Sequence, residues 1–357
     1  MDMGNLDINI TCLVSKIRWL PLIVPEEEQH WVKWLTIFSI TQQSMFIAAT
    51  ILNFYFFYRV KHATSIHVNF RIILCCTSIA FQLNTGSHFI LHKILEYTEH
   101  VEDRFIPNVL AYICCNIHMI NVFGAATCMN MIALEQHLAT IWVENYEQKT
   151  KKIGVILMLL VAAQCIPTGL FYQNTLVTRW DFHTTYNSCL LPDINPQVGF
   201  QSFLLGFITL SGCSVWLMAL RHINEKRMRS RLALTSLSAR FQQTKNSENT
   251  ASITPSMIGY AVLAVSGLFI EGARIKLNNY ACVQDRILLK WVFIVMDGYA
   301  LYHNFCFLYY NHSTRREVLR DLERIFGWDM RHKANVVKTN SAIGEQAAET
   351  YFNNFGW

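Results

Sequence analysis

Long apolar runs separated by short polar segments dominate the pattern of the chain. A helix that crosses a bilayer needs about 20 mostly apolar residues, because the hydrocarbon core is about 30 Å thick and each residue adds about 1.5 Å. The run at 256–273 is the least certain span, because Glu271 interrupts it near its end. We predict seven membrane-spanning helices at residues 34–58, 66–91, 107–134, 153–172, 199–220, 256–273 and 288–310.

The composition agrees with lipid as the solvent. Hydrophobic residues make up 52% of the 357 residues and charged residues only 15%, against roughly 25% charged in ordinary soluble domains. A soluble protein this poor in charge could not cover its surface with polar groups. The net charge of +5 is mild and does not indicate a nucleic-acid partner. The sequence therefore predicts an all-α membrane protein built as one helical bundle.

The basic residues predict how the bundle is oriented, since Lys and Arg gather on the cytoplasmic side of membrane proteins. With the N-terminus outside, 18 of the 30 basic residues fall in inside segments and eight in outside segments. A glycosylation sequon at Asn9 lies in the predicted outside tail, whereas the sequon at Asn311 lies inside and should stay unmodified. The inside segments are residues 59–65, 142–152, 222–255 and 311–357, and the outside segments are 1–33, 92–106, 173–198 and 276–287.

The segment after the last span predicts a helix on the membrane surface. Apolar residues recur there with helical spacing, with arginines largely between them, and Gly327 can end the helix. We expect it to lie on the inner leaflet, in contact with lipid. The predicted organisation is an extracellular tail (1–33), a seven-span domain (34–310), the amphipathic helix (311–328) and a flexible cytoplasmic tail (329–357).

The eleven cysteines show no C-x-x-C or other metal spacing. Cys12, Cys189 and Cys282 lie in predicted outside segments, where an oxidising compartment permits disulfides. A bridge from Cys114 or Cys115 to Cys189 would tie the long second outer loop to the bundle. A Cys12–Cys282 bridge and free thiols remain as alternatives.

Signatures of catalysis, of cofactor binding and of metal binding are missing. The sequence has no G-x-S-x-G, H-E-x-x-H, P-loop or G-x-G-x-x-G motif. His88 and His92 are four residues apart, but they lie at a helix end, where interfacial polar residues are common. We therefore expect no enzyme, no cofactor and no metal site.

Two motifs on the predicted inner side carry a family resemblance. Residues 133–140 read A-L-E-Q-H-L-A-T and are followed by Tyr146-Glu147, and residues 236–246 read S-L-S-A-R-F-Q-Q-T-K-N. The first resembles the L-E-R-x-x-A-T…Y-E pattern, and the second the S-L-S-x-R-F-Q…E-N pattern, of nematode serpentine chemoreceptors of the Sra superfamily, especially the Sre and Srab groups. Gln136 stands where the family usually has Arg. The resemblance covers roughly residues 34–330.

The resemblance implies a chemosensory G-protein-coupled receptor in the plasma membrane, in the sensory cilia of chemosensory neurons. Such a receptor would bind an odorant-like environmental small molecule outside and signal to a heterotrimeric G protein inside. The motifs assign switching and G-protein coupling to Glu135, Gln136, His137, Tyr146 and Arg240. A ligand-gated channel, a transporter and a receptor-like protein that does not signal remain as alternatives.

Polar groups deep inside two spans indicate where a ligand could bind. An ionisable group within the membrane costs about 2.5–3.5 kcal/mol on insertion scales, so it is a functional-site candidate. Asp297 lies about 13 Å below the outer end of the seventh span, and His118 about 16 Å down the third. Asn121 shares a helix face with His118. We expect these side chains to contribute to a ligand pocket, although an interhelical pair would also explain Asp297.

Overall fold

The computed structural model describes residues 29–98, 101–143, 146, 152–176, 182–183, 196–230, 234, 236–277 and 282–327. Every regular element within these residues is an α-helix. The helices are α2 (Gln29–His62), α3 (Val68–Thr98), α4 (Phe105–Ile141), α5 (Lys152–Leu176), α7 (Pro196–Arg229), α8 (Leu237–Leu277), α9 (Cys282–Tyr310) and α10 (His312–Phe326).

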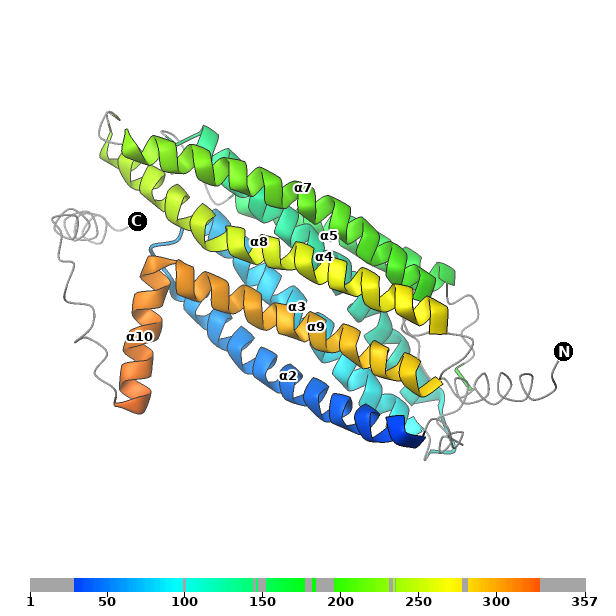
Figure 1. The fold of residues 1–357 in the computed structure, drawn as a ribbon. Helices are drawn as coiled ribbons and strands as arrows, with labels where there is room; N and C mark the ends of the chain where they lie inside the picture. The colour runs from blue at the N-terminus through cyan, green and yellow to red at the C-terminus, as the bar shows by residue number, and fades with distance from the viewer. Residues whose placement is uncertain are drawn as a thin grey trace.

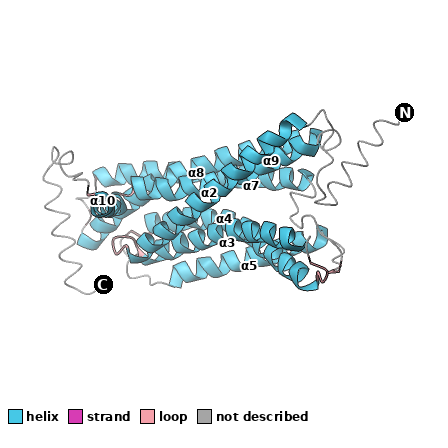
Figure 2. Cartoon of the chain, turned by 90° about the horizontal axis from the view of Figure 1, so that it is seen from below, coloured by secondary structure: helices cyan, strands magenta, loops and turns pink. Residues whose placement is uncertain are grey.

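Seven long helices run up and down through one bundle, and α10 lies across one end of it (Figure 1). The bundle closes on itself because α2, the first of these helices, packs against both α3 and α9. In the view turned by 90°, α10 is seen nearly end-on beside the bundle (Figure 2). We call this the α10 end; helix α2 begins at the opposite end.

Each predicted span coincides with one of the long helices, and the predicted fold class is confirmed. Five helices, α2, α4, α5, α7 and α8, combine the length and apolar composition of a membrane span within the described part of the chain. Helices α3 and α9 have 31 and 29 residues, which is also enough to cross a bilayer. Several of their polar side chains face the bundle interior; His88 and His303, for example, are buried.

The outer surface of the bundle is apolar, as expected of helices in lipid. Large apolar side chains such as Phe54, Phe171 and Phe269 are exposed, the last at 76%. The main buried apolar cluster lies towards the α10 end, where Phe56, Phe70 and other large side chains of α2, α3, α4, α7, α8 and α9 meet.

Helix α10 begins and ends where its sequence allows. The Asn311 side chain accepts a hydrogen bond from the Thr314 backbone N–H at 3.2 Å, which caps the first turn. Gly327 ends the helix with a φ of 65°, a left-handed conformation that glycine adopts without strain. On its bundle side α10 forms ion pairs with Arg59 of α2 through Glu317 and Asp321.

Helix α8 differs most from the predicted boundaries. The apolar run predicted a span at 256–273, but α8 extends from Leu237 to Leu277. The added turns carry Gln242, Gln243 and Asn246, which are all buried inside the bundle. An apolar run marks only the part of a helix that touches lipid, so hydropathy underestimates a helix whose end packs through polar contacts.

Candidate functional site

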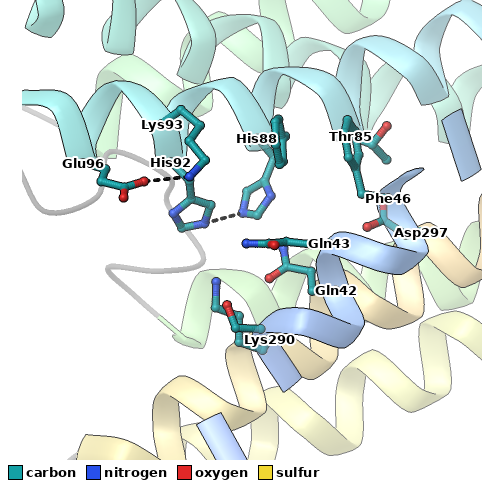
Figure 3. A pocket seen from close by; sticks show the side chains of 12 residues that line it. Gln42, Gln43, Phe46, Thr85, His88, His92, Lys93, Glu96, Lys290 and Asp297 are labelled. Atoms are coloured by element: carbon teal, nitrogen blue, oxygen red, sulfur yellow. Dashed lines mark hydrogen bonds and ion pairs between the residues drawn. The ribbon is translucent and has the colours of Figure 1, made fainter. Parts of the chain in front are cut away.

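A cavity of about 280 Å³ lies between α2, α3 and α9, in the half of the bundle away from α10 (Figure 3). Its lining residues are Ser39, Gln42, Gln43, Phe46, Thr85, His88, Phe89, His92, Lys93, Glu96, Lys290 and Asp297. The positions of these residues on their helices order them by depth. Lys93, Glu96 and Lys290 lie nearest the opposite end, whereas Phe46, Thr85 and Asp297 lie deepest.

Asp297 is 6% exposed as a residue, and it lines this cavity. Within the described residues, no side chain or backbone group donates a hydrogen bond or forms an ion pair to it. Lys290 is seven residues away on the same helix, which corresponds to an axial distance of about 10 Å. Among the described residues, this buried acid at the deep end of the cavity thus has no protein partner.

Two histidines form the α3 wall of the cavity. The Nε2 atoms of His88 and His92 are 3.1 Å apart, a hydrogen-bond distance. A bond between two imidazole nitrogens needs one donor and one acceptor, so at least one of these rings is neutral. The His88 ring also stacks on Phe293 of α9, with 3.6 Å between the ring centroids.

The structure brings only one of the three predicted ligand residues to the cavity wall. Asp297 lines it, but His118 and Asn121 are not among the lining residues. Nδ1 of His118 is 3.1 Å from the Asn84 carbonyl oxygen of α3, and Asn121 donates to the Ile117 carbonyl of its own helix at 2.7 Å. Their predicted contact with a ligand stays a prediction.

A second group of polar side chains lies at the α10 end, around Glu135 of α4. The Tyr146 hydroxyl donates a hydrogen bond to Glu135 Oε1, and Gln136 Nε2 donates to Glu135 Oε2 at 2.6 Å. Asn69 of α3 lies 3.5 Å from the Tyr146 hydroxyl, and the His67 ring packs against the Tyr146 ring at 4.4 Å. We call these five residues the Glu135 cluster.

Two members of the Glu135 cluster, Tyr146 and His67, lie outside the spanning helices, and burial shifts the pKa of each. Burial, followed by the negative charge of Glu135, raises the pKa of Tyr146 well above its usual value, so the phenol remains a donor. Burial, followed by the charge of Arg71, lowers the pKa of His67 from 6.5 to about 4, so this ring is neutral at neutral pH. The cluster is therefore held by a neutral donor bonded to a buried carboxyl group.

Asn69 joins the cluster to α5. Its Oδ1 atom accepts a hydrogen bond from the Gly154 backbone N–H at 3.1 Å. A Cβ atom on Gly154 would lie 2.9 Å from the Asn69 Cα atom, so only glycine permits this approach. Through Asn69 and Tyr146, the Glu135 cluster connects α3, α4 and α5.

Five motif residues were predicted to act in switching and coupling, and the structure places three of them in one cluster and two elsewhere. Glu135, Gln136 and Tyr146 lie in one cluster. The His137 ring instead contacts Trp216 of α7, at 5.1 Å between centroids. Arg240 donates from Nε to the Leu234 carbonyl at 2.8 Å near the start of α8. Their roles in coupling stay predictions.

Beside the cluster, amide side chains hold the end of α4 against α7 and α8. Asn246 Nδ2 donates to the Ala139 carbonyl at 2.7 Å, and Asn224 Nδ2 donates to Thr140 Oγ1 at 3.0 Å. Gln243 Nε2 in turn donates to the Asn224 carbonyl at 3.1 Å. We call Asn224, Gln243 and Asn246 the amide clasp. Uncharged groups thus connect these three helices where they converge.

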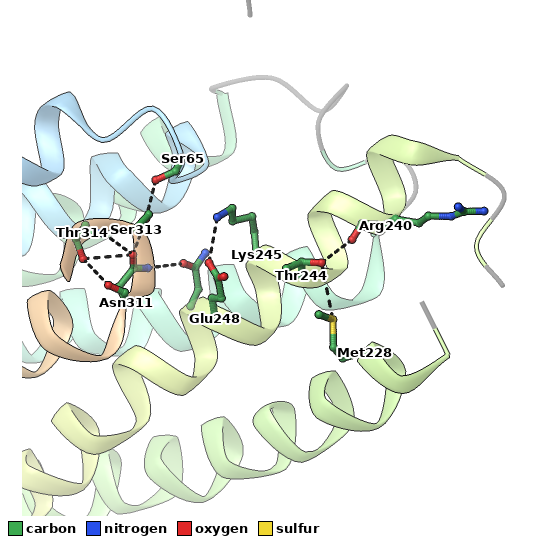
Figure 4. Close-up of polar contacts among 10 residues, drawn as sticks. Ser65, Met228, Arg240, Thr244, Lys245, Glu248, Asn311, Ser313 and Thr314 are labelled. Atoms are coloured by element: carbon green, nitrogen blue, oxygen red, sulfur yellow. Dashed lines mark hydrogen bonds and ion pairs between the residues drawn. The ribbon is translucent and has the colours of Figure 1, made fainter. Parts of the chain in front are cut away.

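Just beyond the second motif, α8 also connects to the start of α10 (Figure 4). Lys245 forms an ion pair with Glu248 at 3.0 Å, one turn along α8. Asn311 Nδ2 donates to Asn249 Oδ1 of α8 at 3.4 Å, while its oxygen caps α10. Movement of α8 at this end would therefore disturb the cap of α10.

The two adjacent cysteines of α4 differ in the structure. Cys115 is disulfide-bonded, whereas its neighbour Cys114 is a free thiol. Cys12 and Cys189 lie outside the described residues. The structure therefore distinguishes the two adjacent cysteines, and the pairing with Cys189 stays a prediction.

A buried charged triad joins α8 to α9 at the opposite end. Arg274 is fully buried and donates from Nη1 to both oxygens of Glu271, at 3.2 and 3.0 Å. The two residues are one turn apart on α8. Arg274 Nε also donates to Asp285 of α9 at 3.0 Å, which the spacing could not show. Two carboxylates thus surround one guanidinium.

Residues that the sequence did not single out complete both sites. Gln42, Gln43 and Thr85 line the cavity, and Asn69 and His67 complete the Glu135 cluster. Each is a polar side chain within or beside an apolar run. Such residues usually face the interior of a bundle, and this signal could have found them.

A bundle of seven long helices, with an apolar outside, a cavity near one end and a polar cluster at the other, defines a multi-pass membrane protein of the serpentine type. The family model for serpentine type 7TM GPCR receptor class ab chemoreceptors matches residues 29–316. The chain belongs to this family, which is one of chemosensory receptors and not of enzymes. The predicted Srab resemblance is confirmed, and the likeness to the Sre group stays a prediction. No curated protein matches the chain.

Proposed function

We propose that this chemosensory receptor binds an environmental small molecule in the cavity between α2, α3 and α9 and signals to a heterotrimeric G protein at the α10 end. The observation that carries the proposal is the position of α3, which contributes to both sites. Thr85, His88 and His92 line the cavity, and Asn69 of the same helix belongs to the Glu135 cluster. A ligand that shifts α3 would therefore act on both.

We assign the Glu135 cluster and the amide clasp to the resting state of the receptor. Both connect α4 to its neighbours at the α10 end, where a G protein would need space to insert. Gln136 Oε1 is buried and has no donor within the described residues. An unsatisfied buried acceptor is costly, so a rearrangement that gives Gln136 a donor would favour the active state.

We infer that the α10 end faces the cytoplasm of the plasma membrane and that the N-terminus is extracellular, in the cilia of chemosensory neurons. The basic loops support this orientation. A glycosylation assay tests it: the tail sequon at Asn9, which lies outside the described residues, should be modified. Asn311 is 1% exposed and caps α10, so it should stay bare. Modification of Asn311 and not Asn9 would reverse the orientation.

We also infer that α10 rests on the inner leaflet. Ile325 and Phe326 are 71% and 57% exposed, and Leu319 is also exposed. Ion pairs with Arg59 hold the other face against α2. An exposed apolar face on a helix lying across the bundle end suits the boundary between headgroups and acyl chains.

A cell expressing the chain with a promiscuous G protein and a reporter tests the function directly. Odorants applied from outside should produce a reporter signal that a G-protein inhibitor abolishes. A ligand-evoked current that survives the inhibitor would favour the channel alternative. A silent wild type beside a signalling Gln136→Arg variant would favour the alternative of a receptor-like protein that does not signal.

A further inference from the structure

We propose that the cavity recognises small amines and that Asp297 binds the protonated nitrogen of such a ligand. The inference rests on the proposed function, because it names the ligand class of the same cavity. Asp297 is 6% exposed, lines the cavity and has no hydrogen-bond or ion-pair partner within the described residues.

The charge distribution around the cavity favours a cationic ligand. Burying a carboxylate without a partner is costly, and proteins normally supply a cation or donors for it. The lysines that line the cavity, Lys93 and Lys290, lie towards its shallow end, and Lys93 is paired with Glu96 at 2.8 Å. His88 and His92 are hydrogen-bonded to each other and at most one carries charge. A ligand ammonium group would supply the missing partner at the deep end.

The apolar part of the lining indicates the rest of the ligand. The Phe46 and Phe89 rings stack at 4.6 Å between centroids and 7° between planes, and both line the cavity. Aromatic rings attract cations at their faces and provide apolar contact for a hydrocarbon chain or a ring. The cavity therefore suits an amine attached to an apolar body.

The cavity volume limits the size of that body. A volume of about 280 Å³ is just below the lower end of the range of about 300–1,000 Å³ typical of small-molecule pockets. A single alkyl or arylalkyl amine fits this space. Larger ligands with several rings would require α2, α3 or α9 to separate.

Thermal unfolding of the purified full-length receptor tests the ligand class without a G protein. The probes are two matched pairs, 2-phenylethylamine with 2-phenylethanol and hexylamine with hexanol. Each pair has the same body and differs in the charged nitrogen. Ligands that bind the folded state raise the unfolding temperature, so we expect the amines to raise it at lower concentrations than the alcohols.

Variants identify Asp297 as the residue responsible. In Asp297→Asn the amine concentration needed for the same shift should rise at least about tenfold, and Asp297→Glu should retain part of the preference. Asp103→Asn is the matched control, since Asp103 is an exposed acid outside the cavity, and should behave as wild type. The unfolding temperature without ligand shows whether each variant is folded.

Three results would overturn the proposal: no shift with either amine, equal shifts with amines and alcohols, or an unchanged amine response in folded Asp297→Asn. The comparison of amine with alcohol uses the wild type and needs no variant to fold. If neutral odorants drive G-protein signalling while amines do not bind, the amine inference fails and the proposed function remains.

Discussion

The Tyr146 hydroxyl donates a hydrogen bond to Glu135 Oε1 from the segment that follows α4, and both residues are at most 1% exposed. This bond holds that segment against the inner turns of α4. Asn69 and His67 pack around it from the α3 side. The proposed resting state therefore depends on a neutral phenol bonded to a buried carboxyl group.

Replacing Tyr146 with Phe should raise ligand-independent signalling severalfold and lower the thermal stability. The substitution leaves a buried Glu135 oxygen without its donor, which costs about 1–3 kcal/mol. That cost applies to the resting arrangement and shifts the equilibrium towards states in which Glu135 is solvated. A G-protein reporter without ligand and thermal unfolding measure the two effects.

Tyr97→Phe is the matched control, because Tyr97 is 61% exposed at the other end of α3, and it should change neither quantity. Equal basal signals in Tyr146→Phe and wild type, at equal surface expression, would show that the Glu135–Tyr146 bond does not restrain the receptor.

Arg274→Met should destabilise the receptor strongly. Removing the guanidinium takes away the cation that contacts both buried carboxylates, Glu271 and Asp285, and breaking a buried ion pair in this way costs about 3–5 kcal/mol. The matched control is Arg221→Met, whose pair with Glu225 is 42% and 48% exposed; an exposed pair contributes about 0–1 kcal/mol. Similar unfolding temperatures for the two variants would show that the triad is not a stabilising contact.

The two adjacent cysteines give a sharp comparison. Cys115→Ser breaks a disulfide and should lower thermal stability and surface expression, by an amount typical of native disulfides, about 2–5 kcal/mol. Cys114→Ser changes a free thiol and should have little effect. Mass spectrometry of the unreduced protein should find Cys115 and not Cys114 in a disulfide-linked peptide, and the reverse would contradict the structure.

Lowering the pH should reduce the free energy of unfolding through protonation of His67, which lies at the α10 end. Its pKa in the folded state, about 4, is below the ordinary 6.5, so between these pH values the unfolded chain binds more protons. The stabilisation by neutral His67 is therefore complete above about pH 6.5 and is lost as the pH falls through the folded value. For this one group the loss at pH 5 is up to about 2 kcal/mol.

Thermal unfolding at about pH 7 and pH 5 measures this effect. His67→Asn retains an acceptor for the Asn69 backbone N–H, which bonds to His67 Nδ1 at 3.3 Å, but removes the titrating ring. The variant should lose less stability on acidification than the wild type does. An exposed histidine, His222, provides the control His222→Asn, which should respond as wild type.

Much of the fold follows from the sequence because lipid imposes a simple requirement. A span must be long and apolar, so the runs at 34–58 and 107–134 correctly marked α2 and α4. Gly327 at the end of the amphipathic pattern correctly marked the end of α10. Hydropathy could not mark the start of α8, because Gln243 and Asn246 bond to other helices and do not face lipid.

The sequence predicted less of the two candidate sites than of the fold. Depth alone identified both Asp297 and His118, but depth does not show which way a side chain points. Asp297 lines the cavity, whereas His118 contacts the Asn84 carbonyl. Similarly, the family resemblance pointed to both Tyr146 and Glu135. It did not point to Asn69, which is 77 residues from Tyr146 in the chain and joins the cluster only because α3 packs against α4.

If the cavity and the α10 end are separate sites joined in one receptor, filling the cavity should abolish the response to ligand and leave basal signalling intact. Thr85→Trp places a large side chain at the deep end of the cavity, and it can be combined with Tyr146→Phe in one chain. The G-protein reporter should then show no odorant response, while the raised basal signal of Tyr146→Phe persists. An undiminished odorant response in Thr85→Trp at normal surface expression would show that the cavity is not the site where the odorant binds.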